Sequence, residues 1–524
     1  MPLVKMLSNK ALTSLIVGAG STLSIVRTPA TNCRHLFTIA NKTVSISKCI
    51  GVEVQLSEST RNFQTGEKTV VPEIISKMEE VLRLSDYDCI GFDLDNTLGE
   101  YQLFENSKLE YELLAKYLVD QKGYDSSILS KSFESDTDFI LRGLVLDTFR
   151  GNILKIGSDG SVLRACHGSK PMSEEAIEEV YGKDRKWNIT SKFVSDPLST
   201  WEGPAAEQMR TLLDYFDAPA SLIFARAVDS VDDRLGRQPE KYTVWSDLIE
   251  GLIYLYSREH FELDKGGYFT ALKSDPPKYV KKCKPQVINW LKELRKTKKL
   301  FVITGSNVDY ASFTATQALG KDWRDLFDVM VFYSRKPGFF TGKRPFINLV
   351  GTNETVPLSS ENLKINNGYS QGNWPDLYQF LSRIVGKSEP KCLYIGDNLL
   401  QDIFTPSEYA HLDTIALSEE LCAESSRDDN PKERHEAESI LRSNFWGSYF
   451  YDEKYNKPTF WSKLINQHSK VCIPNIEALS QVSIDHPLKC FSSDLISANE
   501  TPNTTGYFPY IPASLQSRGN KKDS

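Results

Sequence analysis

Residues Gly91–Leu98 read Gly-Phe-Asp-Leu-Asp-Asn-Thr-Leu and directly follow the apolar pair Cys89–Ile90. The apolar residues predict a buried strand that ends at Asp93 and Asp95, and Asn96–Thr97 suit a tight turn. Side chains alternate along a strand, so we expect the two carboxylates on the same face. Two carboxylates this close both ionise only when a cation lies between them; otherwise one keeps a proton. The stretch therefore suits a carboxylate nucleophile, a neighbouring acid/base and a divalent metal.

The pattern Asp-x-Asp-x-Thr after an apolar strand resembles the signature of haloacid-dehalogenase-type phosphohydrolases. The alternative is a solvated pair of aspartates at a strand end, which a bare Asp-x-Asp would favour. Because an apolar run precedes the pair and Thr97 follows it, phosphoryl transfer is the favoured interpretation.

A second apolar segment, Lys299–Ile303, is followed by Thr304 and Gly305. A hydroxyl side chain and the accessible backbone N–H groups beside a glycine can bind phosphate oxygens. A simple helix cap is the alternative, since Thr-Gly-Ser alone is a weak signal.

A third apolar segment, Cys392–Ile395, ends in Gly396 and Asp397, and Asp402 follows five residues later. Asp397 can reach a metal, and Asp402 is a supporting acid. Ligands of open parallel sheets bind at the carboxyl ends of the strands, so the three segments are expected to converge there.

Lys336 precedes Pro337 and Gly338, which disfavour a helix, so a loop is predicted at this position. A loop ammonium directed into the acidic cluster would neutralise the aspartates and hold a phosphoryl group. The alternative is an ordinary surface lysine.

Together these motifs, in this order, are similar to those of cytosolic-type 5′-nucleotidases of the haloacid dehalogenase superfamily. The resemblance runs from about residue 86 to about residue 510. The stretches that carry it are Arg142–Thr148, Gly151–Lys155, Leu163–Gly168, Lys336–Phe340, Gly368–Asn373, Gly396–Asp397, Trp446–Ser448 and Gly506–Pro509.

The resemblance implies an aspartyl-phosphate mechanism, with Asp93 as the nucleophile and Asp95 as the acid/base. It also implies a Mg²⁺ ion held by Asp93, the backbone carbonyl of Asp95, and Asp397, with Asp402 in support. The phosphoryl oxygens would contact Thr304, Gly305 and Lys336.

The implied substrate is a nucleoside 5′-monophosphate. Phe216 is a candidate for stacking on the base, with a buried core aromatic as the alternative. Two other function classes stay open, because the core motifs contact only the phosphoryl group. One is a phosphatase of a non-nucleotide phosphomonoester, and the other is a low-turnover binding or scaffold protein on the same fold.

The implied fold is α/β, a Rossmann-like doubly wound parallel sheet with a large inserted mixed α+β cap. The gap between Asp93 and Thr304 is too long for one βαβ crossover, so an insertion is required. We expect the catalytic core at 86–104 and 286–425 and the cap at 105–285. Residues 1–85 would be an N-terminal extension. Residues 426–524 would pack on the core and end in a disordered tail.

Composition excludes several other classes. The 524 residues are 40% hydrophobic, enough for a sizeable core, and the net charge of −7 argues against a nucleic-acid partner. No apolar stretch approaches the roughly 20 residues of a membrane span. Nine scattered cysteines without a Cys-x-x-Cys indicate a reduced intracellular protein. A homo-oligomer stays open.

The N-terminal lead contains six Lys or Arg residues before its first acidic residue, Glu53. An acid-free, basic lead rich in Ser and Thr is typical of a mitochondrial presequence. A secretory signal around Leu12–Ala19 and a disordered extension are the alternatives. The expected location is the cytoplasm or the mitochondrial matrix.

Overall fold

The computed structural model describes residues 80–201, 203–425, 440–492 and 504–516, which belong to one structural unit. The predicted presequence and the tail beyond residue 516 lie outside the described residues. Among the residues described, no helix is both long and apolar enough to cross a bilayer.

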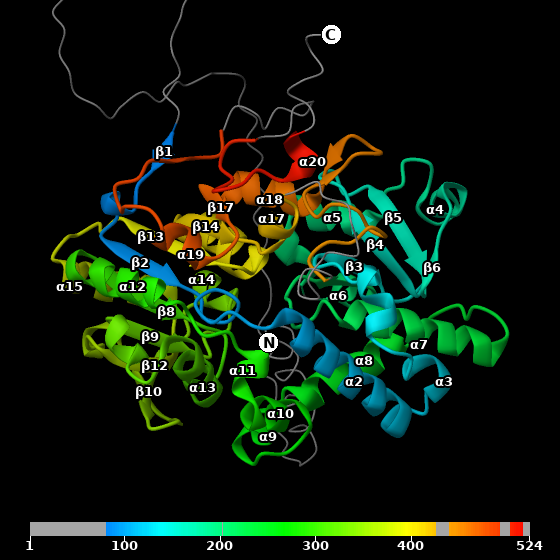
Figure 1. Cartoon of the computed structure of the whole chain (residues 1–524), viewed down its shortest axis with the longest axis horizontal. Helices are drawn as coiled ribbons and strands as arrows, with labels where there is room; N and C mark the ends of the chain where they lie inside the picture. Colours follow the sequence, from blue (N-terminus) through cyan, green and yellow to red (C-terminus); the bar gives the residue numbers. More distant parts are fainter. Residues whose placement is uncertain (1–79, 202, 426–439, 493–503, 517–524) are drawn as a thin grey trace, which may run out of the picture. The chain divides into compact units, whose positions relative to one another are not determined.

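A nine-stranded sheet organises the chain (Figure 1). In spatial order its strands are β11 (Asn353–Leu358), β10 (Phe346–Val350), β12 (Asn367–Gln371), β9 (Val329–Phe332), β8 (Lys299–Ile303), β2 (Cys89–Phe92), β13 (Cys392–Gly396), β14 (Asp413–Leu417) and β17 (Val471–Ile473). The seven strands from β12 to β17 are parallel, and β10 and β11 join antiparallel. The prediction of an α/β fold with a parallel sheet is confirmed at this level.

The three predicted strands lie side by side in the order β8, β2, β13. Every residue of β2 and β13 is buried, as is all of β8 after its first residue. Strands covered on both faces are continuous apolar runs rather than alternating ones, which is the pattern seen in the sequence.

Between β2 and β8 the chain builds a second, antiparallel sheet in the order β6-β5-β4-β3-β7. Its strands are β3 (Leu144–Asp147), β4 (Asn152–Ile156), β5 (Val162–His167), β6 (Lys170–Pro171) and β7 (Met209–Leu212). The helices of this inserted segment are α2 (Leu103–Lys122), α3 (Ser126–Leu129), α4 (Glu174–Tyr181), α5 (Asn188–Ser195), α6 (Pro204–Gln208), α7 (Ala220–Leu235), α8 (Val244–Leu255), α9 (Arg258–Glu262), α10 (Tyr268–Ser274) and α11 (Pro276–Tyr279).

The remaining helices accompany the large sheet and the C-terminal part. They are α12 (Pro285–Thr297), α13 (Val308–Leu319), α14 (Gly338–Thr341), α15 (Trp374–Val385), the π-helix η6 (Leu399–Phe404), α16 (Thr405–Ala410), α17 (Glu420–Ala423), α18 (Phe460–His468), α19 (Ile476–Ser480) and α20 (Ala513–Gln516).

The C-terminal part does more than pack on the sheet, because it supplies the edge strand β17. It also pairs β18 (Leu488–Lys489) with β1 (Val81–Leu82) and forms a two-stranded ribbon, β15 (Tyr451–Asp452) with β16 (Lys457–Pro458). The N-terminal and C-terminal ends of the described chain are thereby joined.

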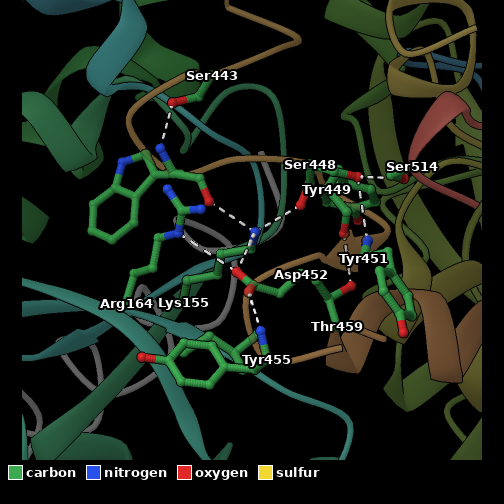
Figure 2. Close-up of polar contacts among 12 residues, drawn as sticks. Lys155, Arg164, Ser443, Ser448, Tyr449, Tyr451, Asp452, Tyr455, Thr459 and Ser514 are labelled. Carbon is green, nitrogen blue, oxygen red and sulfur yellow. Dashed lines mark hydrogen bonds and ion pairs between the residues drawn. The ribbon is translucent and has the colours of Figure 1, made fainter. Parts of the chain in front are cut away.

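A buried lysine attaches this C-terminal part to the antiparallel sheet (Figure 2). Lys155 Nζ, on β4, donates hydrogen bonds to the carbonyl oxygens of Trp446 (2.8 Å) and Ser448 (2.7 Å). It also lies 3.7 Å from Asp452 Oδ2, which Arg164 Nε approaches to 3.5 Å. Burial lowers the pKa of Lys155 to about 8.

Candidate active site

The carboxyl ends of three adjacent strands bring the predicted residues to one edge of the sheet. Asp93 follows β2, Thr304 follows β8 and Asp397 follows β13. The Asp93 backbone N–H donates to the Ile395 carbonyl oxygen (2.9 Å), and the Thr304 N–H donates to the Val331 carbonyl oxygen (2.9 Å). Sheet hydrogen bonding thus fixes two of the three strand ends to their neighbours.

Three aspartates form a buried cluster at this edge. Asp93, Asp397 and Asp402 each offer a carboxylate oxygen, and these oxygens lie within 4.8 Å of one another. Burial raises the pKa of Asp93 to about 7. It also raises the pKa of Asp402 above its ordinary value, and that of Asp397 well above its ordinary value. Asp397 Oδ2 has no hydrogen-bond partner among the described residues. A small hard cation, which prefers oxygen ligands, fits this set.

Lys336 lies inside the same cluster. Its Nζ is 2.8 Å from Asp93 Oδ1 and 2.5 Å from Asp402 Oδ1, and its side chain is buried. Burial alone would lower the pKa of Lys336, but the two carboxylates raise it above its ordinary value. The ammonium is therefore charged and offsets part of the negative charge.

The segment around Lys336 differs in part from the expectation. Lys336 lies in a turn after β9, as predicted. Gly338 nevertheless begins a one-turn helix, α14, with Pro337 just before its first residue. Proline is compatible with a helix start because the first N–H groups of a helix have no intrahelical partner.

Asp95 has a different set of neighbours. Strand β2 ends at Phe92, so Asp93 and Asp95 lie beyond its end and strand alternation does not govern their side chains. Asp95 Oδ1 accepts a hydrogen bond from the Tyr101 hydroxyl (2.8 Å), and Oδ2 accepts one from the Thr304 hydroxyl (3.4 Å) and one from Ser306. The Asp95 carboxylate is therefore not one of the three in the cluster.

Thr304 is fully buried and its hydroxyl is already engaged within the protein. Its Oγ1 accepts a hydrogen bond from the Ser306 backbone N–H (3.0 Å) while it donates to Asp95. The adjacent Gly305 is partly exposed. Ser306 was not singled out in the sequence, although it is the third residue of the Thr-Gly-Ser motif.

Arg142 is a second residue that sequence reasoning did not assign. Its guanidinium is 1% exposed and binds Glu420 through two hydrogen bonds of 2.8 Å. Its Nη1 also donates to the backbone carbonyl of Asp397 (3.2 Å), directly beside the cluster. The only signal in the sequence was its place in the Arg-Gly-Leu-Val-Leu-Asp stretch.

Phe216 is 3% exposed and packs edge-on against two tyrosines. The ring centroids of Phe216 and Tyr101 are 4.9 Å apart, and those of Phe216 and Tyr256 are 6.2 Å apart. The Phe216 ring contacts Tyr101, and the Tyr101 hydroxyl in turn donates a hydrogen bond to Asp95.

Comparison with known proteins adds the family to this geometry. Residues 78–445 match the model of the 5′ nucleotidase family. The chain belongs to the 5′ nucleotidase family. It is therefore a phosphomonoester hydrolase, as the motifs predicted.

Similar curated proteins agree with this membership. Human 5′-nucleotidase domain-containing protein 1 is 35% identical over 467 residues, which cover 84% of this chain and 98% of that protein. The Bos taurus protein of the same name is also 35% identical, over 84% of this chain and 99% of that protein. Rattus norvegicus 5′-nucleotidase domain-containing protein 2 is 24% identical over 77% of this chain and 76% of that protein.

Proposed function

We propose that this chain is a Mg²⁺-dependent 5′-nucleotidase that hydrolyses nucleoside 5′-monophosphates through an aspartyl-phosphate. The observation that carries the proposal is the buried cluster of Asp93, Asp397 and Asp402 with the Lys336 ammonium inside it. The family and the names of the similar proteins support the nucleotide as substrate.

The proposed architecture is that of the haloacid dehalogenase superfamily. The parallel sheet would be the doubly wound catalytic core, at 86–104 and 286–425, and the inserted segment at 105–285 would be the cap. Two features support the division: the insertion has its own antiparallel sheet, and the proposed site residues follow strands of the parallel sheet. The C-terminal part at 426–524 would complete the core through β17.

Asp93, Asp397 and the backbone carbonyl of Asp95 would hold the Mg²⁺, with Asp402 in support. The unpartnered Asp397 Oδ2 and the close carboxylates fit an ion with hard oxygen ligands. When bound, the ion neutralises charge that develops on the transferring phosphoryl oxygens.

In the first step Asp93 would attack phosphorus, and its carboxylate oxygen would bond to phosphorus as the bond to the leaving oxygen breaks. Asp95 would donate its proton to that leaving oxygen. In the second step Asp95 would take a proton from water, whose oxygen displaces Asp93 from phosphorus. The Gly305 backbone N–H and Lys336 would stabilise the phosphoryl oxygens in both steps. The Thr304 hydroxyl would join them by turning from Asp95 toward the bound phosphoryl group.

The test is a panel of phosphate esters with purified protein and Mg²⁺. We expect turnover of nucleoside 5′-monophosphates, which Asp93→Asn abolishes because an amide cannot attack phosphorus. Asp120→Asn, an exposed aspartate on α2, is the matched control and is expected to keep wild-type turnover.

Each alternative has its own outcome in this panel. Preferential turnover of sugar phosphates or phosphopeptides would contradict the nucleotide assignment. Absence of turnover on every ester, together with no phosphate or beryllofluoride adduct at Asp93, would indicate a binding protein. Near wild-type turnover by Asp93→Asn would show that the nucleophile assignment is wrong.

A further inference from the structure

Tyr101 is a fully buried residue whose hydroxyl contacts the proposed acid/base. The hydroxyl donates to Asp95 Oδ1 at 2.8 Å and lies 2.9 Å from the hydroxyl of Tyr310 on α13. On the other side of the carboxylate, the hydroxyls of Thr304 and Ser306 donate to Oδ2. The two oxygens of Asp95 are therefore held from opposite sides by different groups.

Tyr101 is itself fixed at the junction between the inserted segment and the sheet. Its backbone forms an antiparallel bridge with Val280, where the chain returns from the insertion. The next residue, Gln102, donates its backbone N–H to the Tyr279 carbonyl oxygen (2.9 Å). The edge contact with Phe216 restrains the ring. Backbone and ring together thus set the position of the hydroxyl.

We propose that Tyr101 is a positioning residue for Asp95, whose hydroxyl holds Oδ1 and so fixes the orientation of the proposed acid/base carboxyl. This inference rests on the proposed function. A phenol stays protonated at neutral pH, whereas the Thr304 and Ser306 hydroxyls can rotate between donating and accepting. The Tyr101 hydroxyl is therefore the donor with the more fixed direction, and it holds Oδ1 in one place.

In the proposed reaction Asp95 is the side chain that gives up and regains a proton. The proton passes from the Asp95 carboxyl to the leaving oxygen as the P–O bond breaks, and water returns one to Asp95 as Asp93 is displaced. Tyr101 keeps its own proton in both steps. Without the Tyr101 hydroxyl Oδ1 loses the donor that holds it, and the Asp95 carboxyl would keep the orientation for proton transfer for only part of the time.

The test compares two leaving groups in Tyr101→Phe, which removes only the hydroxyl. A nucleoside 5′-monophosphate releases a poor alkoxide that needs a proton, whereas para-nitrophenyl phosphate releases a phenolate that needs little. General acid catalysis contributes about 10²–10⁴-fold, so losing its positioning is expected to slow the nucleotide by about tenfold or more. The loss on the nitrophenyl ester is expected to stay under about threefold.

Tyr111→Phe is the matched control. Tyr111 is also buried, and its hydroxyl donates to the Leu129 carbonyl oxygen (2.8 Å), away from Asp95. This variant is expected to change both rates by the same factor, since any effect comes through packing.

A double-mutant cycle separates positioning from packing. If Tyr101 acts through Asp95, Tyr101→Phe adds little further loss on the nucleotide in an Asp95→Asn background. Equal losses on the two esters, or an undiminished loss in the Asp95→Asn background, would overturn the inference alone. Absence of wild-type turnover on both esters would overturn the proposed function, and the inference with it.

Discussion

Lys336→Met removes one charge from the centre of the proposed site and keeps most of the side-chain volume. The ammonium lies 2.8 Å from Asp93 Oδ1 and 2.5 Å from Asp402 Oδ1, so both carboxylates lose their cation and stay buried. Burial already raises the pKa of Asp93 to about 7, and Lys336 opposes that rise. Loss of the lysine is therefore expected to raise the pKa of Asp93 further in the metal-free protein, toward the protonated form that cannot attack phosphorus.

The expected loss follows from the second role of the ammonium, stabilisation of the transferring phosphoryl oxygens. Removing one preorganised electrostatic donor of this kind costs about 2.7–4 kcal/mol, or about 100-fold to 1000-fold in turnover. The measurement is kcat on a nucleoside 5′-monophosphate at saturating Mg²⁺ and neutral pH. Circular dichroism is recorded in parallel to confirm that the variant is folded.

Lys343→Met provides the control, because Lys343 is exposed and lies seven residues further along the same region of the chain. It is expected to retain turnover within about twofold to threefold, the range ordinary for surface substitutions. If a folded Lys336→Met showed a loss no larger than that control, the electrostatic role of Lys336 would be refuted.

Asp95, Asp397 and Lys155 offer three further tests. Asp95→Asn is expected to slow nucleotide hydrolysis far more than para-nitrophenyl phosphate hydrolysis, and equal losses in steady-state assays would give Asp95 a structural role. Asp397→Ala removes a proposed ligand oxygen and is expected to raise the Mg²⁺ concentration for half-maximal rate by about tenfold or more, whereas an unchanged Mg²⁺ titration would contradict the ligand assignment. The folded-state pKa of Lys155, about 8, lies below its ordinary 10.5, so the folded protein binds fewer protons between these values and its stability rises with pH there. Urea unfolding of wild type and Lys155→Met at about pH 7 and about pH 10 measures the two free energies of unfolding. Wild type is expected to gain stability relative to Lys155→Met at the higher pH, and a relative loss would contradict the prediction.

The strands that carry the site were predictable because each is a short apolar run with a polar end. β8 and β13 begin at the predicted residues, Lys299 and Cys392, since full burial on both faces leaves a continuous hydrophobic signal. Asp402 was expected only as a supporting acid, yet its carboxylate lies in the cluster with those of Asp93 and Asp397. The motif order placed it near the site but could not give the distance.

The partners of the site residues were not predictable from spacing. The hydroxyl of Tyr101 and the guanidinium of Arg142 find their acceptors through tertiary packing, which no periodicity in the sequence encodes. β17 was missed for a related reason, because its three residues lie in the C-terminal part and become a strand only by pairing with β14. Short elements of this kind depend on their neighbours more than on their own propensity.

The position of β2 in the sheet has a consequence for how the chain is made. β2 is flanked by β8 and β13, and the first of these begins about 200 residues after β2 ends. At a synthesis rate of about 5–20 residues per second, the apolar strand waits on the order of 10–40 s for its first partner. The inserted segment, whose antiparallel sheet is complete before β8 is synthesised, can fold during that interval. A newly made chain therefore exposes β2 to chaperones and to aggregation for longer than any other part of the parallel sheet.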